Sequence, residues 1–175
     1  SLPTSDKGLR SLYADLVGRE PTLLEEMIVQ HPTMAAVYPD AVNTIRVLAL
    51  RAGNEVSILA AMARFGRERN TDNFSIDGLV SDIDIDSGEL ATPGVDKYGI
   101  ARPRHPRTGH RFVGLKIPMW EEVISLATSA SLAAEGVDFI GWDIAILEDR
   151  AVIVEGNARP GTGLVQAPYA TARFG

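Results

Sequence analysis

The spacing of apolar residues predicts two helices, one near the start of the chain and one in its second half. The first ends near Val17, because Gly18 follows it and glycine favours helix termination. Its apolar face consists of Leu9, Leu12, Tyr13 and Leu16. The second runs from Pro118 to about Glu135, since proline suits the first turn of a helix and an apolar stripe begins at Trp120.

Most of the other apolar segments have the length and the residue types of strands. They lie at 21–29, 44–50, 56–65 and 78–86 and, as two further strands, within 139–157. The dipeptide Gly53-Asn54 predicts a hairpin, because both residues tolerate positive φ. Residues 31–40 contain two prolines and predict a bend or a short helical turn.

Two segments lack a regular pattern and are expected to be loops. Residues 92–111 are rich in proline, glycine and basic side chains, and the tail beyond Arg159 is rich in proline and glycine. The loop around His105 and His110 either closes over an acidic substrate or the phosphates, or is a solvated mobile segment. Several hairpins and a few helices, without a βαβ rhythm, predict an α+β fold. It would be an antiparallel sheet with flanking helices, in a single domain over 1–175.

Composition excludes several classes of function. The net charge of -6 argues against nucleic acid and anionic membranes as partners, because both attract basic surfaces. The chain has no cysteine, so a metal would be held by oxygen or imidazole ligands. No apolar run approaches the roughly 18 residues of a membrane helix, and the N-terminus does not have the pattern of a signal peptide. A cytoplasmic location is the expectation.

Three oxygen-bearing side chains interrupt the apolar strands of the last hairpin: Asp143 in GWDIAI, and Glu155 and Asn157 in VIVEGNARPG. An unpaired carboxylate in a buried strand costs several kcal/mol, so something must neutralise these groups. Two carboxylates and an amide oxygen suit Mg²⁺. The alternative is a hairpin whose polar groups are hydrogen-bonded at the end of a sheet.

The length of the connecting turn decides whether these side chains meet. If the connection is 148–150, then Leu147 faces Ala151 and Asp143 faces Glu155, so that both carboxylates project from one face. A two-residue connection without a bulge would place them on opposite faces. Asn157 follows Glu155 on the same face.

An acidic strand residue followed after about a dozen positions by ExN and Pro-Gly resembles the magnesium-binding end of the ATP-grasp superfamily. The segments NTIR, GLKIPMWEE and GWDIAI to VEGN are most similar to the sugar-transfer-associated ATP-grasp family. This similarity extends from about Leu23 to Gly161. Asp77 departs from the pattern, because relatives usually have a glycine there.

The resemblance implies roles for individual residues. Asp143, Glu155 and Asn157 would be magnesium ligands, and Glu25, Glu26, Ile28 and Asn73 would contact ATP. Arg46 would neutralise the transferred phosphate. Arg159 would contact phosphate or substrate, with a plain surface arginine as the alternative, and Arg64 is a weaker candidate than Arg46.

The resemblance also implies an activity, an ATP- and magnesium-dependent carboxylate-amine ligase that acts through an acyl phosphate. Its partners would be a small carboxylate and a small amine. Only some twenty residues precede Leu23, so the chain is expected to be the C-terminal part of an ATP-grasp domain without its nucleotide-gripping lobe, and inactive by itself. The alternatives are a catalytically silent interaction module and a phosphotransferase that uses the same metal site.

Overall fold

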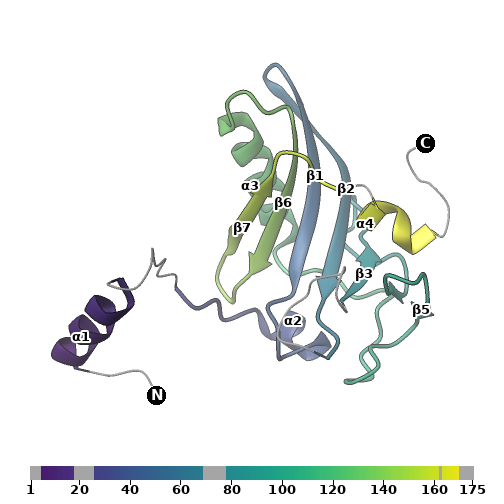
Figure 1. The fold of residues 1–175 in the computed structure, drawn as a ribbon. Coiled ribbons are helices and arrows are strands. Elements are labelled where there is room, and N and C mark those ends of the chain that lie inside the picture. Colours follow the sequence, from purple (N-terminus) through teal and green to yellow (C-terminus); the bar gives the residue numbers. More distant parts are fainter. Residues whose placement is uncertain (1–4, 18–25, 69–77, 162, 170–175) are drawn as a thin grey trace.

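A computed structural model describes residues 5–17, 26–68, 78–161 and 163–169 of the chain. All strand pairs in these segments are antiparallel and form one sheet of seven strands in the order β5-β4-β3-β2-β1-β6-β7 (Figure 1). The strands are β1 Thr44–Ala52, β2 Glu55–Phe65, β3 Leu79–Asp82, β4 Gly94–Val95, β5 Ala101–Arg102, β6 Phe139–Ile146 and β7 Ala151–Asn157. The helices are α1 Asp6–Val17, α2 Pro32–Val37, α3 Trp120–Ala133, α4 Gly163–Gln166 and the 3-10 turn Ala167–Tyr169. The predicted α+β fold with an antiparallel sheet is confirmed.

The two faces of the sheet are covered differently. One face packs against α3 and α2 through the larger apolar core, which includes Phe65, Phe112 and Val123. The other face carries a smaller apolar cluster that is completed by Val165 of α4. In Figure 1, α3 lies behind the sheet and α4 in front of it, near β3. Among the described residues, α4 contacts β2 on this front face, and the 3-10 turn contacts β3 and β4.

A hydrogen-bonded pair fixes the turn that leads into β1. Asn43 is fully buried, and its Nδ2 donates to the carbonyls of Met34 and Tyr38 and to Gln30 Oε1. Its Oδ1 accepts from the N–H of Gly66, which follows β2. Gln30 in turn donates to the carbonyls of Tyr38 and Ala41. Because unpaired buried polar groups are costly, this network holds the chain before α2 against the start of β1 and the end of β2.

The long hairpin and the helices agree with the sequence prediction. Gly53 has a φ of +65°, whereas Asn54 does not have positive φ, as in a turn that needs glycine only at its first central position. α3 begins at Trp120 rather than at the predicted Pro118, because Met119 takes a left-handed conformation with a φ of 53°.

α1 has no buried residue and lies apart from the sheet in Figure 1. Within the described segments, no helix is long and apolar enough to cross a bilayer.

Four predicted segments differ from the structure. Residues 26–29 belong to no helix or strand, so the predicted strand is wrong there, and 21–25 lie outside the described residues. The strand expected at 78–86 ends at Asp82, because Asp84 accepts the N–H of Ser87 and starts a turn. The expected loop at 92–111 contains β4 and β5. The tail expected to be loop contains α4 and the 3-10 turn.

Candidate active site

The β6–β7 hairpin brings the two predicted carboxylates together by an unexpected route. Its turn is tighter than predicted, because Ile146 rather than Leu147 pairs with Ala151, and the Leu147 N–H donates to the Arg150 carbonyl at 2.8 Å. A two-residue turn alone would separate the carboxylates. The register then shifts between Asp143 and Ile144, so that Asp143 pairs with Glu155. A β-bulge thus restores the pairing that the sequence predicted.

The extra residue of the bulge is Val154. Ile144 pairs with Ile153, and the next pair is Asp143 with Glu155, which leaves Val154 without a partner. Directly paired residues project to the same face, and Asn157 lies two residues further along the same strand. Asp143, Glu155 and Asn157 therefore share the front face of the sheet.

Two glycines let other groups approach this hairpin closely. A Cβ on Gly141 would lie 2.7 Å from the Cβ of Pro160 and 3.2 Å from the Cδ of Arg46. A Cβ on Gly156 would lie 2.5 Å from the ring of Trp142. Gly141 thus makes room on the front face for Pro160 and Arg46, whereas Gly156 makes room on the back face for Trp142.

Asp143 is held by two arginines, one from the neighbouring strand β1 and one from β2 beyond it. Arg46 donates from Nε to Oδ1 and from Nη2 to Oδ2, the latter at 2.7 Å, and Arg64 Nη1 donates to Oδ2 at 2.7 Å. The Asp143 side chain is 5% exposed and both arginine side chains are 12% exposed. Removing such charges from water costs several kcal/mol, which this geometry offsets by forked, charge-assisted hydrogen bonds.

The arginines also fix the charge state of Asp143. Burial favours the neutral acid, but the hydrogen bond from Arg46 and the positive charges of Arg64 and Arg46 outweigh it, so the pKa of Asp143 lies below its ordinary value. Asp143 is therefore a carboxylate at neutral pH.

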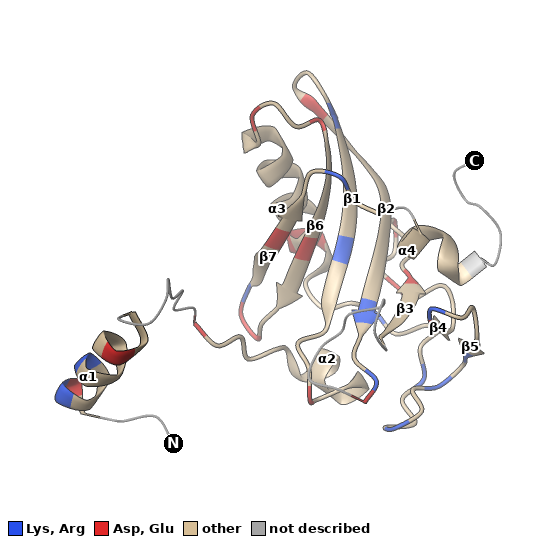
Figure 2. Ribbon diagram, viewed as in Figure 1, with Lys and Arg blue, Asp and Glu red and all other residues tan. Residues whose placement is uncertain are grey.

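Figure 2 shows acidic positions side by side on β6 and β7, next to basic positions on β1 and β2. This agrees with the register, in which Arg46 pairs with Asp143 and Asp143 with Glu155. Glu155 is exposed, and Asn157 is half-buried with its Nδ2 at 3.5 Å from the Gly141 carbonyl. We call Arg46, Arg64, Asp143, Glu155 and Asn157 the front-face cluster.

Two charged side chains of this face received little or no weight in the sequence prediction. Arg64 contacts the same carboxylate as Arg46, although it was the weaker candidate. Asp82 is buried and pairs with Met62, which shares a face of β2 with Arg64. The available signal was the same for both, a charged residue inside an otherwise apolar strand.

The other predicted site residues are not all near this cluster. Glu26 and Ile28 lie in the extended segment before α2, which is tied to the end of β6 by the His31 N–H donating to the Ile146 carbonyl at 2.7 Å. That point is three residues from Asp143, or about 10 Å along the strand. Arg159 is exposed beside Pro160, which packs on Gly141. Glu25 and Asn73 lie outside the described residues.

The donor chemistry of the front-face cluster fits a hard divalent cation. Asp143, Glu155 and Asn157 supply carboxylate and amide oxygens, which are the ligands that Mg²⁺ prefers. Asp143 accepts three of the about four hydrogen bonds that a carboxylate can accept, and Glu155 is exposed. In the described residues, no three His, Cys, Asp or Glu side chains gather as a metal site.

Comparison with known proteins identifies the family. No curated protein and no solved structure matches the chain significantly. The sequence model of the sugar-transfer-associated ATP-grasp family matches residues 7–174, almost the whole length. Together with the antiparallel α+β fold, this match shows that the chain belongs to the sugar-transfer-associated ATP-grasp family.

Proposed function

We propose that this chain carries the metal- and phosphate-handling part of an ATP- and Mg²⁺-dependent carboxylate-amine ligase. The observation that supports this most is the front-face cluster, in which two guanidinium groups and two carboxylates from four adjacent strands lie on one face. Family membership supports ATP as the energy source.

In the proposed reaction, a carboxylate oxygen of the substrate bonds to the γ-phosphorus of ATP, and ADP leaves with the electrons of the broken P–O bond. An amine then attacks the acyl carbon, loses a proton, and inorganic phosphate leaves. The catalytic work is mainly the positioning of groups and the neutralisation of charge.

The cluster has groups for both tasks. Asp143, Glu155 and Asn157 would hold Mg²⁺, which supplies positive charge to the phosphate oxygens. Arg46 and Arg64 would stabilise the transferred phosphoryl group, because guanidinium forks match phosphate oxygens. Arg159 would contact phosphate or substrate, and Glu26 and Ile28 would belong to the adenine and ribose site.

The charge balance of the cluster argues that metal and nucleotide bind together. Its two arginines and two acids sum to no net charge, so a bare cation gains little from entering. A cation that arrives with phosphates offers the guanidinium groups new partners in place of Asp143. Binding of metal and nucleotide should therefore be mutually strengthening.

The test is carboxylate-dependent release of ADP by the protein expressed from the full reading frame that encodes this chain. Glu155→Gln should lower turnover at least roughly 100-fold, because it removes a charged ligand. Glu148→Gln is the matched control, since Glu148 is also exposed and lies in the turn of the same hairpin.

Three outcomes would contradict the proposal. ADP release that needs an alcohol or a sugar hydroxyl in place of a carboxylic acid would indicate a phosphotransferase. Absence of ATP binding in the full-length protein would indicate a silent module. Equal turnover in the Glu155 and Glu148 variants would remove the metal role of Glu155.

A further inference from the structure

A second group of arginines lies in residues 102–111, a hairpin that begins at the last residue of β5 and that we call the arginine hairpin. Arg104 and Arg111 form an antiparallel bridge across it. The hydrogen bonds that flank the bridge join His105 N–H to the His110 carbonyl at 2.8 Å and Phe112 N–H to the Pro103 carbonyl at 3.3 Å. This is the pattern of a non-hydrogen-bonded pair, in which Cα atoms are only about 4.5 Å apart and the side chains leave on the same face.

The charges of this pair are not balanced. Like charges directly opposite each other destabilise a hairpin. Arg102 and Arg107 of the same hairpin have acidic partners, Asp96 at 3.3 Å and Asp40 at 2.5 Å. In the described part of the chain, neither Arg104 nor Arg111 forms an ion pair, and both are exposed. Arg104 donates from Nη1 to the Gly109 carbonyl at 3.0 Å, a neutral partner that leaves its charge unbalanced. Figure 2 shows the basic residues gathered in the loops around β4 and β5.

The fold nevertheless holds the hairpin in place. His105 is buried and its Nε2–H donates to the Gly66 carbonyl at 2.8 Å, while the Thr108 hydroxyl donates to the Val37 carbonyl at 2.8 Å. The arginine pair therefore cannot relax by moving the backbone away. Such a preorganised pair of cations is suited to a ligand that supplies the missing negative charge.

A hollow lies beside the pair. It is a shallow, open depression of about 400 Å³, lined by Ala101, Arg102, Pro103, Arg104 and Pro106. Because it is open, a ligand held there would stay partly in contact with solvent. Two of its five lining residues are arginines, whose forked N–H groups fit the oxygens of phosphate and carboxylate.

We propose that the arginine hairpin binds a small molecule with at least two oxyanion charges, held between Arg104 and Arg111 and reaching into the hollow beside Arg102. The ligand chemistry is a phosphate-bearing or multiply carboxylated molecule. The hairpin is anchored at Gly66, two residues after Arg64 of the front-face cluster. If the proposed ligase activity holds, this ligand is the carboxylic acid substrate, which is then a polyanion. That identification of the ligand rests on the proposed function.

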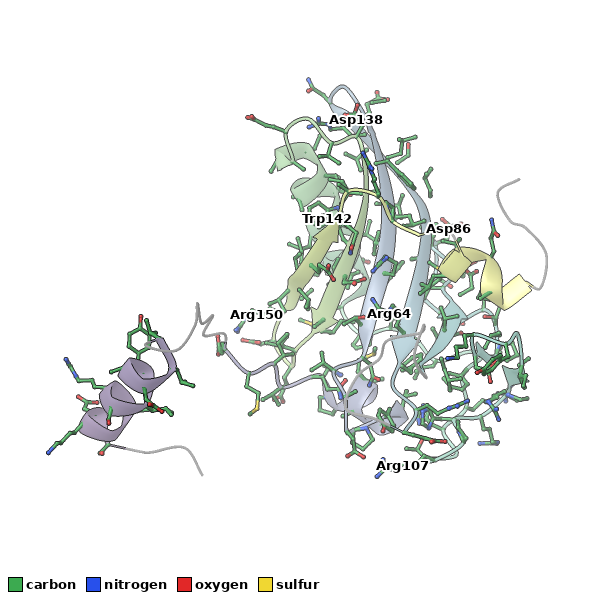
Figure 3. All side chains as sticks on the ribbon, viewed as in Figure 1. Arg64, Asp86, Arg107, Asp138, Trp142 and Arg150 are labelled. Atoms are coloured by element: carbon green, nitrogen blue, oxygen red, sulfur yellow. The ribbon has the colours of Figure 1, made fainter. Side chains whose placement is uncertain are left out.

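The test uses this chain with inorganic pyrophosphate and with citrate, each in separate calorimetric titrations at low ionic strength, without ATP or Mg²⁺. The double variant Arg104→Gln/Arg111→Gln should weaken binding at least about tenfold, because charge-assisted hydrogen bonds are lost. The control is Arg10→Gln/Arg150→Gln, which makes the same change in net charge at exposed positions of α1 and of the β6–β7 turn. Figure 3 shows Arg150 well apart from Arg107, which belongs to the arginine hairpin, so this control position is distant from the proposed site.

Each result decides the proposal. Loss of affinity in the hairpin variant alone supports it, and the probe that binds more tightly identifies phosphate or carboxylate chemistry. Equal affinity in both double variants, or no binding of either probe by the wild type, would overturn it. Neither result depends on ADP release, so the hairpin site and the ligase proposal fail separately.

A stability measurement gives an independent check. Without added anion at low salt, Arg111→Gln should have a higher Tm than the wild type, because it removes the repulsion between the paired guanidinium groups and leaves the hydrogen bond from Arg104 to Gly109 in place. A lower Tm would show that the pair is already balanced and would contradict the proposal.

Discussion

The ring of Trp142 lies across Gly156, in the space that any larger residue at position 156 would fill. The nearest ring atom is 2.5 Å from the position of a Cβ on Gly156, and the indole N–H donates to the Ser131 hydroxyl on α3 at 2.8 Å. Because Gly156 stands between Glu155 and Asn157, this contact ties the proposed ligands of β7 to the helix behind the sheet.

Replacing this glycine should therefore destabilise the protein. Alanine normally stabilises an extended segment relative to glycine by restricting the unfolded chain, but the clash with Trp142 should outweigh that gain and cost about 1–3 kcal/mol. Chemical denaturation of Gly156→Ala measures this cost. Gly161→Ala is the control, because nothing lies within 4 Å of its added Cβ. A variant as stable as the wild type would mean that the Trp142 ring can move aside.

Neutralising Asp143 should be costly even without any ligand. Asp143→Asn keeps the volume of the side chain but removes the negative charge that Arg46 and Arg64 both contact, so we expect a loss of about 3 kcal/mol in the free energy of unfolding. Asp149→Asn is the matched control, since Asp149 is exposed and its pair with Arg150 should contribute less than about 1 kcal/mol. Equal effects of the two substitutions would contradict a structural role for the buried ion pairs.

The Gln30–Asn43 network predicts a large effect at a position that the proposed chemistry does not use. Asn43→Ala should cost about 3 kcal/mol, because it leaves several buried donors and acceptors unpaired around α2. Asn54→Ala, in the exposed β1–β2 turn, should cost much less. Thermal and chemical unfolding of both variants test this, and a similar small loss in both would show that water replaces the Asn43 contacts.

His105 should make the stability depend on pH. Burial lowers the pKa of His105 below its ordinary value of 6.5, and the charges of Arg107, Arg67 and His110 lower it further, although the hydrogen bond to Gly66 opposes this. Its Nε2–H donates to Gly66 while Nδ1 accepts from the N–H groups of Arg107 and Thr108, so the neutral ring fills both roles.

The unfolded chain therefore binds the proton more readily than the folded protein. The stabilising contribution of neutral His105 is fully present above about pH 6.5 and is lost as the pH falls from there through the folded pKa. An NMR titration of the His105 ring, compared with denaturation between pH 8 and pH 5, checks the sign. A folded pKa above 6.5, or stability that rises on acidification through this window, would contradict it.

The sequence predicted the pairing of Asp143 with Glu155 for an incomplete reason. Alternation along the strands and the polar residues near 148 limited the turn to a few lengths, and a three-residue connection gave the right pairing. The structure reaches it with a shorter turn and a bulge at Val154. Periodicity alone does not reveal a bulge, because an extra apolar residue in an apolar strand leaves no mark in the sequence.

Other features depend on contacts between distant segments, which composition cannot show. The segment 92–111 has the residues of a loop, yet His105, Thr108 and Asp96 bind backbone groups that give it a fixed shape. Residues 26–29 have the residues of a strand, but no neighbouring strand pairs with them. Local propensity predicted the long hairpins and α3, whose backbone hydrogen bonds form within the element itself. It was less reliable for segments whose hydrogen-bonding partners lie far away in the sequence.

The arrangement of the front-face cluster has a consequence for how the protein folds. Arg46 and Arg64 lie 97 and 79 residues before Asp143 in sequence. The β1–β2 hairpin joins nearby residues and can form early, but it then presents two cations with no carboxylate from β6 beside them. Contacts over such separations carry a high entropic cost of chain closure and form slowly. Docking of the β6–β7 hairpin therefore neutralises the two arginines of the β1–β2 hairpin. The proposed catalytic surface exists only once that late step is complete.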